Sequence, residues 1–202
     1  MHRLSFRTLP ALLAAALLCA SVHAERGDVH FAVRVPISLC WWTPTDDDWH
    51  GKVSGLGGIR AGIDLFPLTQ GKYLDERGFR PSLRLLAGYR LGMGDPATYS
   101  ARLHTLLADC SLLFRYNVTG QHHGYIGLGA QWQADMLDYE PKYRGRTLEA
   151  WRGTALSVCA GYELALGGRL WAFGELGFTH PVGGGLLDAF MPVLGLSWGI
   201  EP

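Results

Sequence analysis

Apolar residues alternate with small or polar ones through residues 154–166, and only a β-strand places every second side chain on one face. One face runs from Leu156 to Leu166 and is apolar, whereas the other is small or polar with a single charge, Glu163. Gly167-Gly168 follows, and glycine readily adopts the positive φ of a tight turn. With the similar run at residues 170–180, the segment predicts a β-hairpin with two chemically different faces.

The same alternation recurs along the chain and predicts an all-β fold without a helical segment. Each apolar-polar run is long enough for a tilted transmembrane strand, which needs ~9–11 residues. Long connections after odd-numbered strands and short ones after most even-numbered strands match long external loops and short periplasmic turns. The predicted strands are Asp28–Cys40, Gly55–Phe66, Ser82–Leu91, Ala101–Tyr116, Gly124–Leu137, Thr154–Leu166, Leu170–His180 and Ala189–Ile200.

The first 24 residues have the pattern of a secretory signal peptide. Arg3 and Arg7 form a basic start, residues 11–20 an apolar core, and Val22-His23-Ala24 a small-residue cleavage site. We expect residues 25–202 to form one mature barrel domain. Without those two arginines the 18 basic residues become 16 against 18 acidic ones, a balance that argues against a nucleic-acid partner.

The composition of the two faces indicates which one meets lipid. A soluble barrel would place lysine and glutamate at most outward positions, but this chain has only Lys52, Lys72 and Lys142. The non-apolar faces are rich in Gly, Ala and Ser, which suits the interior of an eight-stranded barrel. We therefore expect the large apolar side chains to face lipid, with aromatic girdles at the interfaces formed by Trp41, Trp42, Tyr116, Tyr125 and Trp198.

These patterns, from Asp28 to Glu201, resemble the small eight-stranded outer-membrane β-barrels of Gram-negative bacteria. The last predicted strand, Leu194-x-Leu196-x-Trp198-x-Ile200, resembles the C-terminal strand that these proteins offer to their insertion machinery. The usual final aromatic residue is absent, because the sequence closes with Ile200-Glu201-Pro202. The resemblance implies an antiparallel up-and-down transmembrane barrel located in the outer membrane.

The predicted lumen carries equal numbers of bases and acids. Arginine can bridge carboxylates with two hydrogen bonds, so balanced charge favours a packed network that closes the lumen. A narrow selective pore or a substrate site is the alternative. The predicted lumen charges are Arg34, Arg60, Asp64, Arg84, Arg90, Asp109, Arg115, Asp135, Glu163 and Glu175.

Candidates for catalysis are few. His104 is expected on the lipid face, where the resemblance includes barrel enzymes that trim lipid A with a His-x-Ser pair, but here the sequence is His104-Thr105-Leu106. His122-His123 is interpreted as part of a turn, and Cys110 and Cys159 as packing residues. No nucleophile, metal or phosphate-binding motif is present, so we predict no catalytic residue, metal or cofactor.

The sequence favours a monomeric, non-enzymatic outer-membrane barrel with a role in envelope structure or surface interaction. Expected partners are outer-membrane lipid, lipopolysaccharide and the barrel-insertion machinery. In the loops, Lys142, Arg144, Arg146 and Arg152 are positioned to contact lipopolysaccharide phosphates, and Asp46–Asp48 to hold divalent cations, although simple solvated charge is the alternative. A lipid A-modifying enzyme, a narrow channel and a soluble lipid-binding barrel remain the alternatives for the whole chain.

The register of the opening hairpin tests the face assignment. A two-residue turn would pair Leu164 with Trp171 and leave Glu175 facing lipid, because directly opposed residues share a face. A three-residue turn, residues 167–169, pairs Leu164 with Ala172 and places Glu175 in the lumen. A charge near the bilayer midplane costs up to ~2–4 kcal/mol. We therefore predict the three-residue turn.

Overall fold

The structure is a computed structural model that describes residues 29–44, 54–69, 79–93, 99–141, 147–182 and 189–200. These residues form eight antiparallel strands. The predicted signal peptide and the predicted long loops lie outside these residues, apart from the parts of the loops that belong to strands. The strands are β1 (Val29–Pro44), β2 (Ser54–Thr69), β3 (Phe79–Met93), β4 (Tyr99–Thr119), β5 (His122–Pro141), β6 (Thr147–Gly167), β7 (Leu170–Pro181) and β8 (Ala189–Ile200). The predicted all-β fold is confirmed.

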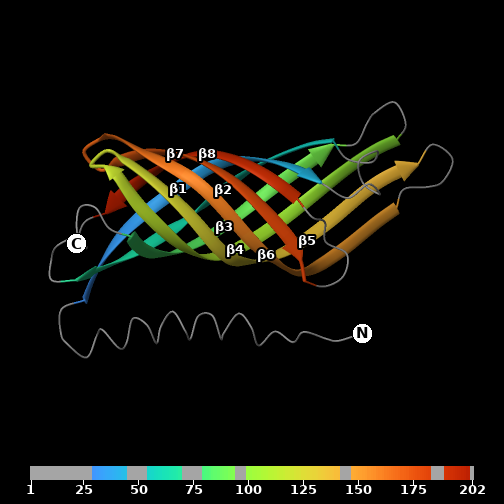
Figure 1. Ribbon diagram of the computed structural model, residues 1–202. Coiled ribbons are helices and arrows are strands. Elements are labelled where there is room, and N and C mark those ends of the chain that lie inside the picture. Colours follow the sequence, from blue (N-terminus) through green and yellow to red (C-terminus); the bar gives the residue numbers. More distant parts are fainter. Residues whose placement is uncertain are drawn as a thin grey trace.

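Each strand pairs with its sequence neighbours, and β8 pairs with β1, so the sheet is a closed up-and-down barrel (Figure 1). A row of paired residues that starts at Arg34 and passes once through all strands returns to β1 at Pro44. This stagger of ten residues tilts the strands against the barrel axis, as closure requires. With eight strands, the interior is just wide enough for side chains to fill.

The strands β4, β5 and β6 are the longest, with 21, 20 and 21 residues. Turns at residues 120–121 and 168–169 join β4 to β5 and β6 to β7 at one end of the barrel, which we call the turn end; the opposite end is the distal end. The predicted loop over residues 138–153 is partly wrong. Here β6 begins at Thr147, because its pairing with β5 continues from Gly153–Gln133 to Thr147–Tyr139.

The β6–β7 hairpin has the predicted register. Leu164 pairs with Ala172 and Ala160 with Leu176, and the pairing shifts by one residue between Ala165 and Gly167. The predicted three-residue turn is wrong in its extent: the turn is residues 168–169, and the extra residue lies on β6 as a bulge. Gly167 and Gly168 have φ of 127° and 56°, which an L side chain rarely adopts, so glycine is needed at both positions. The register places Glu175 inside the barrel.

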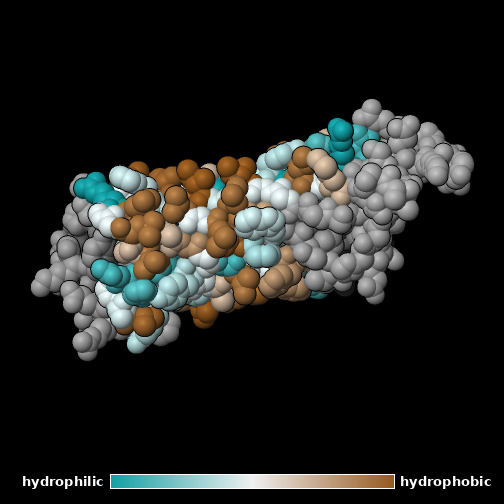
Figure 2. Space-filling model, turned by 90° about the horizontal axis from the view of Figure 1, so that it is seen from above, coloured by the Kyte–Doolittle hydropathy of each residue, from teal (hydrophilic) through white to brown (hydrophobic). Residues whose placement is uncertain are grey.

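Apolar side chains cover the outside of the described barrel. Leu39, Ile59, Leu112, Leu128 and Leu194 are among the exposed large hydrophobic residues. Figure 2 shows apolar side chains across the middle of one face and hydrophilic ones nearer the two ends. An exposed apolar band of this extent is costly in water and suits the hydrocarbon of a bilayer.

Aromatic residues lie at both ends of this band, as an interface girdle requires. Tyr116, Tyr162 and Trp198 are exposed near the turn end, and Trp41 and Tyr89 are exposed towards the distal end. The girdle prediction is wrong for Tyr125, which is buried in the lumen. The side chain of Trp42 lies outside the described residues. Among the described residues, no helix is long and apolar enough to cross a membrane.

Candidate functional site: the charged interior

All ten side chains predicted for the lumen charge network lie inside the barrel. Nine are buried and Arg34 is half-buried near the turn end. They form two groups along the barrel. A compact ion-pair cluster fills the half near the turn end, and a chain of hydrogen bonds fills the distal half. The ion-pair cluster consists of Arg34, Arg60, Asp64, Arg84, Arg115, Glu163 and Glu175.

Asp64 on β2 is held by two arginines. Arg84 Nε donates to its Oδ1 at 2.8 Å and Arg84 Nη2 to its Oδ2 at 3.1 Å. This two-point contact matches the planar guanidinium to the carboxylate. Arg115 Nη2 also donates to Oδ2, at 2.6 Å, and Arg115 contacts the Ser82 hydroxyl. Asp64 therefore joins β2 to β3 and β4 through its side chain.

Glu163 on β6 is the second acceptor. Arg115 Nε donates to its Oε1 at 3.0 Å and Arg34 Nη1 to its Oε2 at 3.1 Å. Arg84 Nη2 lies 3.9 Å from Oε1, and His123 Nδ1 lies 3.8 Å from Oε2. These contacts come from β1, β3, β4 and β5, so Glu163 is surrounded by donors from four strands.

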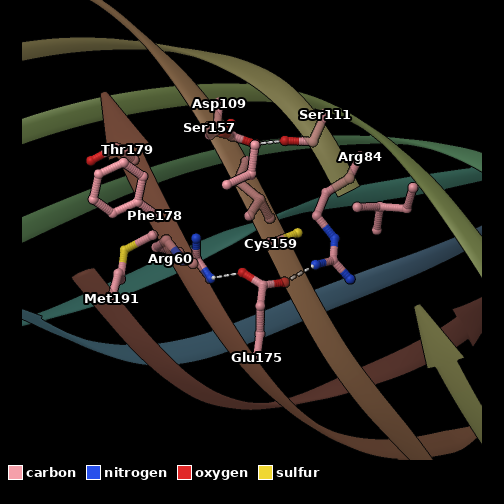
Figure 3. Close-up of a pocket in the computed structure, with 14 residues that line it drawn as sticks. Arg60, Arg84, Asp109, Ser111, Ser157, Cys159, Glu175, Phe178, Thr179 and Met191 are labelled. Carbon is pink, nitrogen blue, oxygen red and sulfur yellow. Dashed lines mark hydrogen bonds and ion pairs between the residues drawn. The ribbon is translucent and has the colours of Figure 1, made fainter. Parts of the chain in front are cut away.

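Glu175 on β7 completes the cluster. Arg84 Nη1 donates to its Oε2 at 2.7 Å, Arg60 Nη2 to its Oε1 at 3.1 Å, and the Tyr125 hydroxyl to Oε2 at 2.9 Å. Figure 3 shows Glu175 between Arg60 and Arg84. Because β7 pairs only with β6 and β8, these bonds to β2 and β3 cross the lumen rather than follow the sheet.

Aromatic rings pack against the arginines of this cluster. The Arg34 guanidinium lies 4.3 Å from the Trp171 ring centre and 4.7 Å from that of Phe66. Arg115 lies 4.6 Å from Phe66, and Arg84 lies 5.4 Å from Phe173. Cations are attracted to the faces of aromatic rings, most strongly where water is excluded. The rings therefore fill the space between the ion pairs and stabilise the cations.

The distal half of the lumen carries hydrogen bonds with fewer charges. Thr105 Oγ1 donates to Asp135 at 2.5 Å, and Gln133 donates to the other oxygen of Asp135 at 2.7 Å. Gln131 donates to Gln133 at 2.9 Å, and Arg90 Nη2 donates to the same oxygen at 3.4 Å. This chain extends the packed polar interior towards the distal end.

Two lumen residues are not predicted by the sequence patterns. His123 was assigned to a turn, but the turn is residues 120–121 and His123 lies on β5, stacked on Trp171 at 4.7 Å between ring centres. Tyr125 was assigned to a girdle, but it donates to Glu175. The signal was present, because the predicted lumen residue Asp135 has an odd number on the same strand, as His123 and Tyr125 do.

The candidate catalytic histidine faces outward. His104 is half-buried on β4, and its Nδ1 lies 2.6 Å from the Tyr89 hydroxyl. Leu106, two residues farther along, is exposed, and its aliphatic side chain carries no nucleophilic group. No group of three or more His, Cys, Asp or Glu side chains that could hold a metal occurs in the described part of the chain.

Comparisons with known proteins identify the fold. No protein-family model and no curated protein matches the chain. A major outer membrane protein from Thermus thermophilus is 10% identical with a TM-score of 0.58, covering 84% of this chain and 100% of that one. The N-terminal β-barrel domain of Pseudomonas aeruginosa OprF is 13% identical (TM-score 0.48, 83% and 97%), and the outer membrane enzyme PagL is 14% identical (TM-score 0.47, 83% and 99%).

The whole length of the Thermus protein matches the fold of this chain. The apolar exterior of this chain is consistent with a barrel that spans a membrane. Both observations support the predicted outer-membrane localisation. The chain therefore has the fold of the small eight-stranded transmembrane β-barrels of outer membranes.

Proposed function

We propose that this chain is a monomeric, non-enzymatic outer-membrane barrel whose lumen is closed by ion pairs, and that it serves envelope structure or surface interaction through its external loops. One observation carries the proposal. Glu175 on β7 bonds Arg60 on β2 and Arg84 on β3, while Glu163 on β6 bonds Arg34 on β1 and Arg115 on β4. Three of these four pairs join strands that lie three or four apart round the eight-stranded barrel, so they lie across the route that an ion would take.

The packing of the cluster supports a closed interior further. Aromatic rings occupy the space beside the arginines, and each cluster carboxylate has more than one donor. Buried charges without such partners would be strongly destabilising. A network of this kind resists opening, because moving one side chain would leave several charges unpaired.

We expect the purified protein to give no single-channel current steps in planar lipid bilayers, because the ion pairs occupy the lumen. The measurement is the current at constant voltage after insertion, with an open porin in the same bilayers as the positive control. Insertion is checked separately by protease protection in vesicles. Stable, reproducible current steps from properly inserted protein would contradict a closed lumen.

Lipopolysaccharide is the proposed lipid partner. Arg102 on β4 and Arg152 on β6 are exposed on strand faces that point outward, near the distal end. Guanidinium groups bind phosphates with two hydrogen bonds, so this position beyond the aromatic girdle suits lipid headgroups. Lys142, Arg144, Arg146 and Asp46–Asp48 lie outside the described residues. The barrel-insertion machinery is proposed as a transient partner of β8, whose outward face carries Leu194, Leu196 and Trp198.

A lipid A-modifying activity is the alternative function, and the outward position of His104 beside Tyr89 is the observation that favours it. Leu106 argues against it, because the expected nucleophile position is aliphatic. We expect the mass spectrum of lipid A to be unchanged when cells express the protein. Expression of a His104→Ala variant serves as the control, since an acyl-chain change seen with wild type and lost in the variant would establish the enzyme.

A further inference from the structure

A small cavity lies inside the barrel beside the ion-pair cluster (Figure 3). Its lining includes Arg60 and Glu175 of the ion-pair cluster on one side, and Asp109 with its hydroxyl partners Ser111 and Ser157 on the other. Thr179 and Gly177 of β7 also line it. Its volume is about 20 Å³. A cavity needs roughly 10–15 Å³ by this measure to hold one water molecule.

Two buried polar atoms of the lining have no hydrogen-bond partner among the described residues. They are Arg60 Nε and Thr179 Oγ1. Arg60 is 3% exposed and Thr179 is 1% exposed, so bulk solvent does not satisfy them. The bond from Arg60 to Glu175 uses Nη2 and leaves Nε available. An unmatched buried donor is costly, and native proteins commonly satisfy such groups with internal water.

Asp109 supplies acceptors on the other side of the cavity. It accepts a hydrogen bond from Ser157 Oγ at 3.1 Å and another from Ser111. Within the described residues, no arginine, lysine or histidine lies within 4.0 Å of its carboxylate. A carboxylate can accept about four hydrogen bonds, so Asp109 has capacity for a further donor.

We propose that this cavity is a binding site for one ordered water molecule, which hydrogen-bonds Arg60 Nε–H and Thr179 Oγ1 and links them towards the Asp109 carboxylate. Water fits the lining because it both donates and accepts. A cation would meet Arg60 and Arg84, whereas an anion would meet Asp109 and Glu175. The site thus connects two hydrogen-bond networks that the side chains alone leave separate.

Thr179→Val tests the proposal by the sign of its effect. Valine has nearly the same shape, so the substitution removes the hydroxyl without opening a void. If the hydroxyl binds water, the midpoint of urea unfolding in lipid vesicles should fall by roughly 0.3–1 M. If the cavity is dry, removing an unsatisfied hydroxyl should leave the midpoint unchanged or raise it, which would overturn the proposal. Thr105→Val, whose hydroxyl bonds Asp135, calibrates the loss of one satisfied hydroxyl.

Gly177→Ala provides a second variant, which adds a methyl group to the cavity lining instead of removing a hydroxyl. A Cβ at this position would meet Met191 Cε at 3.4 Å and the Met191 carbonyl oxygen at 3.5 Å, which are ordinary contacts. The methyl group would enter the cavity. We expect it to displace the water and lower the unfolding midpoint. Gly→Ala alone gains about 0.4–1 kcal/mol through the unfolded chain, so a rise beyond that gain would indicate a dry cavity and overturn the proposal.

A high-resolution crystal structure of the wild-type barrel provides the direct observation. We expect density for one water within hydrogen-bond distance of both Arg60 Nε and Thr179 Oγ1, and loss of that density in Gly177→Ala. An empty cavity in the wild type at a resolution that shows other internal waters would overturn the proposal. Neither result depends on whether the barrel conducts ions.

Discussion

Arg84→Met is expected to destabilise the barrel by about 3–5 kcal/mol, because it removes one partner of a buried ion network. Arg84 donates two hydrogen bonds to Asp64 and one to Glu175, and none of the three side chains has appreciable contact with water. Methionine keeps much of the volume, so the loss reports charge and hydrogen bonding more than packing. The measurement is reversible urea unfolding from lipid vesicles, followed by tryptophan fluorescence.

Arg152→Met is the matched control, because Arg152 is exposed on the outside of β6. Its effect should stay within about 0.5 kcal/mol. A double-mutant cycle with Glu175→Gln separates the pair from the rest of the network. The double variant should lose less stability than the sum of the two single variants, since residues in one network couple. Additive effects, or an Arg84→Met loss no larger than that of the control, would refute the structural role of the cluster.

Leu128→Arg is expected to destabilise the inserted barrel by about 2–4 kcal/mol, the cost of a lipid-facing arginine near the bilayer midplane. Leu128 is 61% exposed on the outward face of β5, and its cross-strand neighbours on the same face are Leu112 and Val158. The apolar band extends on both sides of it towards the girdles. The same vesicle unfolding assay reports the loss.

Leu148→Arg is the control for depth. Leu148 is 64% exposed, also faces outward, and lies near the distal end of β6 beyond Arg152. Arginine near an interface costs only about 0–1 kcal/mol. Equal effects of the two substitutions would mean that the exposed apolar residues do not form a membrane band, and a soluble barrel would then be favoured.

The architecture could be predicted from the sequence, because the alternation of side chains along a β-strand is a local pattern. Parity along each strand assigns a side chain to one face, and composition then distinguishes lipid from lumen. The hairpin register was also predictable, since pairing Leu164 with Ala172 rather than with Trp171 keeps Glu175 out of lipid. The error at residues 138–153 arose where Arg152 interrupts an apolar face while the backbone pairing continues.

The pairing of the charges was not predictable from the sequence. Which arginine reaches Glu175 depends on the ten-residue stagger and on the width of the lumen, and neither is encoded locally. The roles of His123 and Tyr125 were not predictable from residue type, which suggests a turn and an interface girdle, whereas their alternation along β5 places both in the lumen. An aromatic residue near a strand end is typical of an interface girdle, but in a narrow barrel it can equally fill the lumen and stack on arginine.

The cross-lumen bonds also constrain how the barrel assembles. Glu175 is separated by 115 residues from Arg60 and by 91 from Arg84, so its partners are in reach only after the sheet has curled round on itself. An open sheet of the same strands in hydrocarbon would leave cations and anions unneutralised, together with unpaired backbone groups at both edges. A partly closed barrel is therefore destabilised both by its unneutralised charges and by its unpaired backbone groups. We therefore expect insertion and closure of the barrel to be strongly coupled.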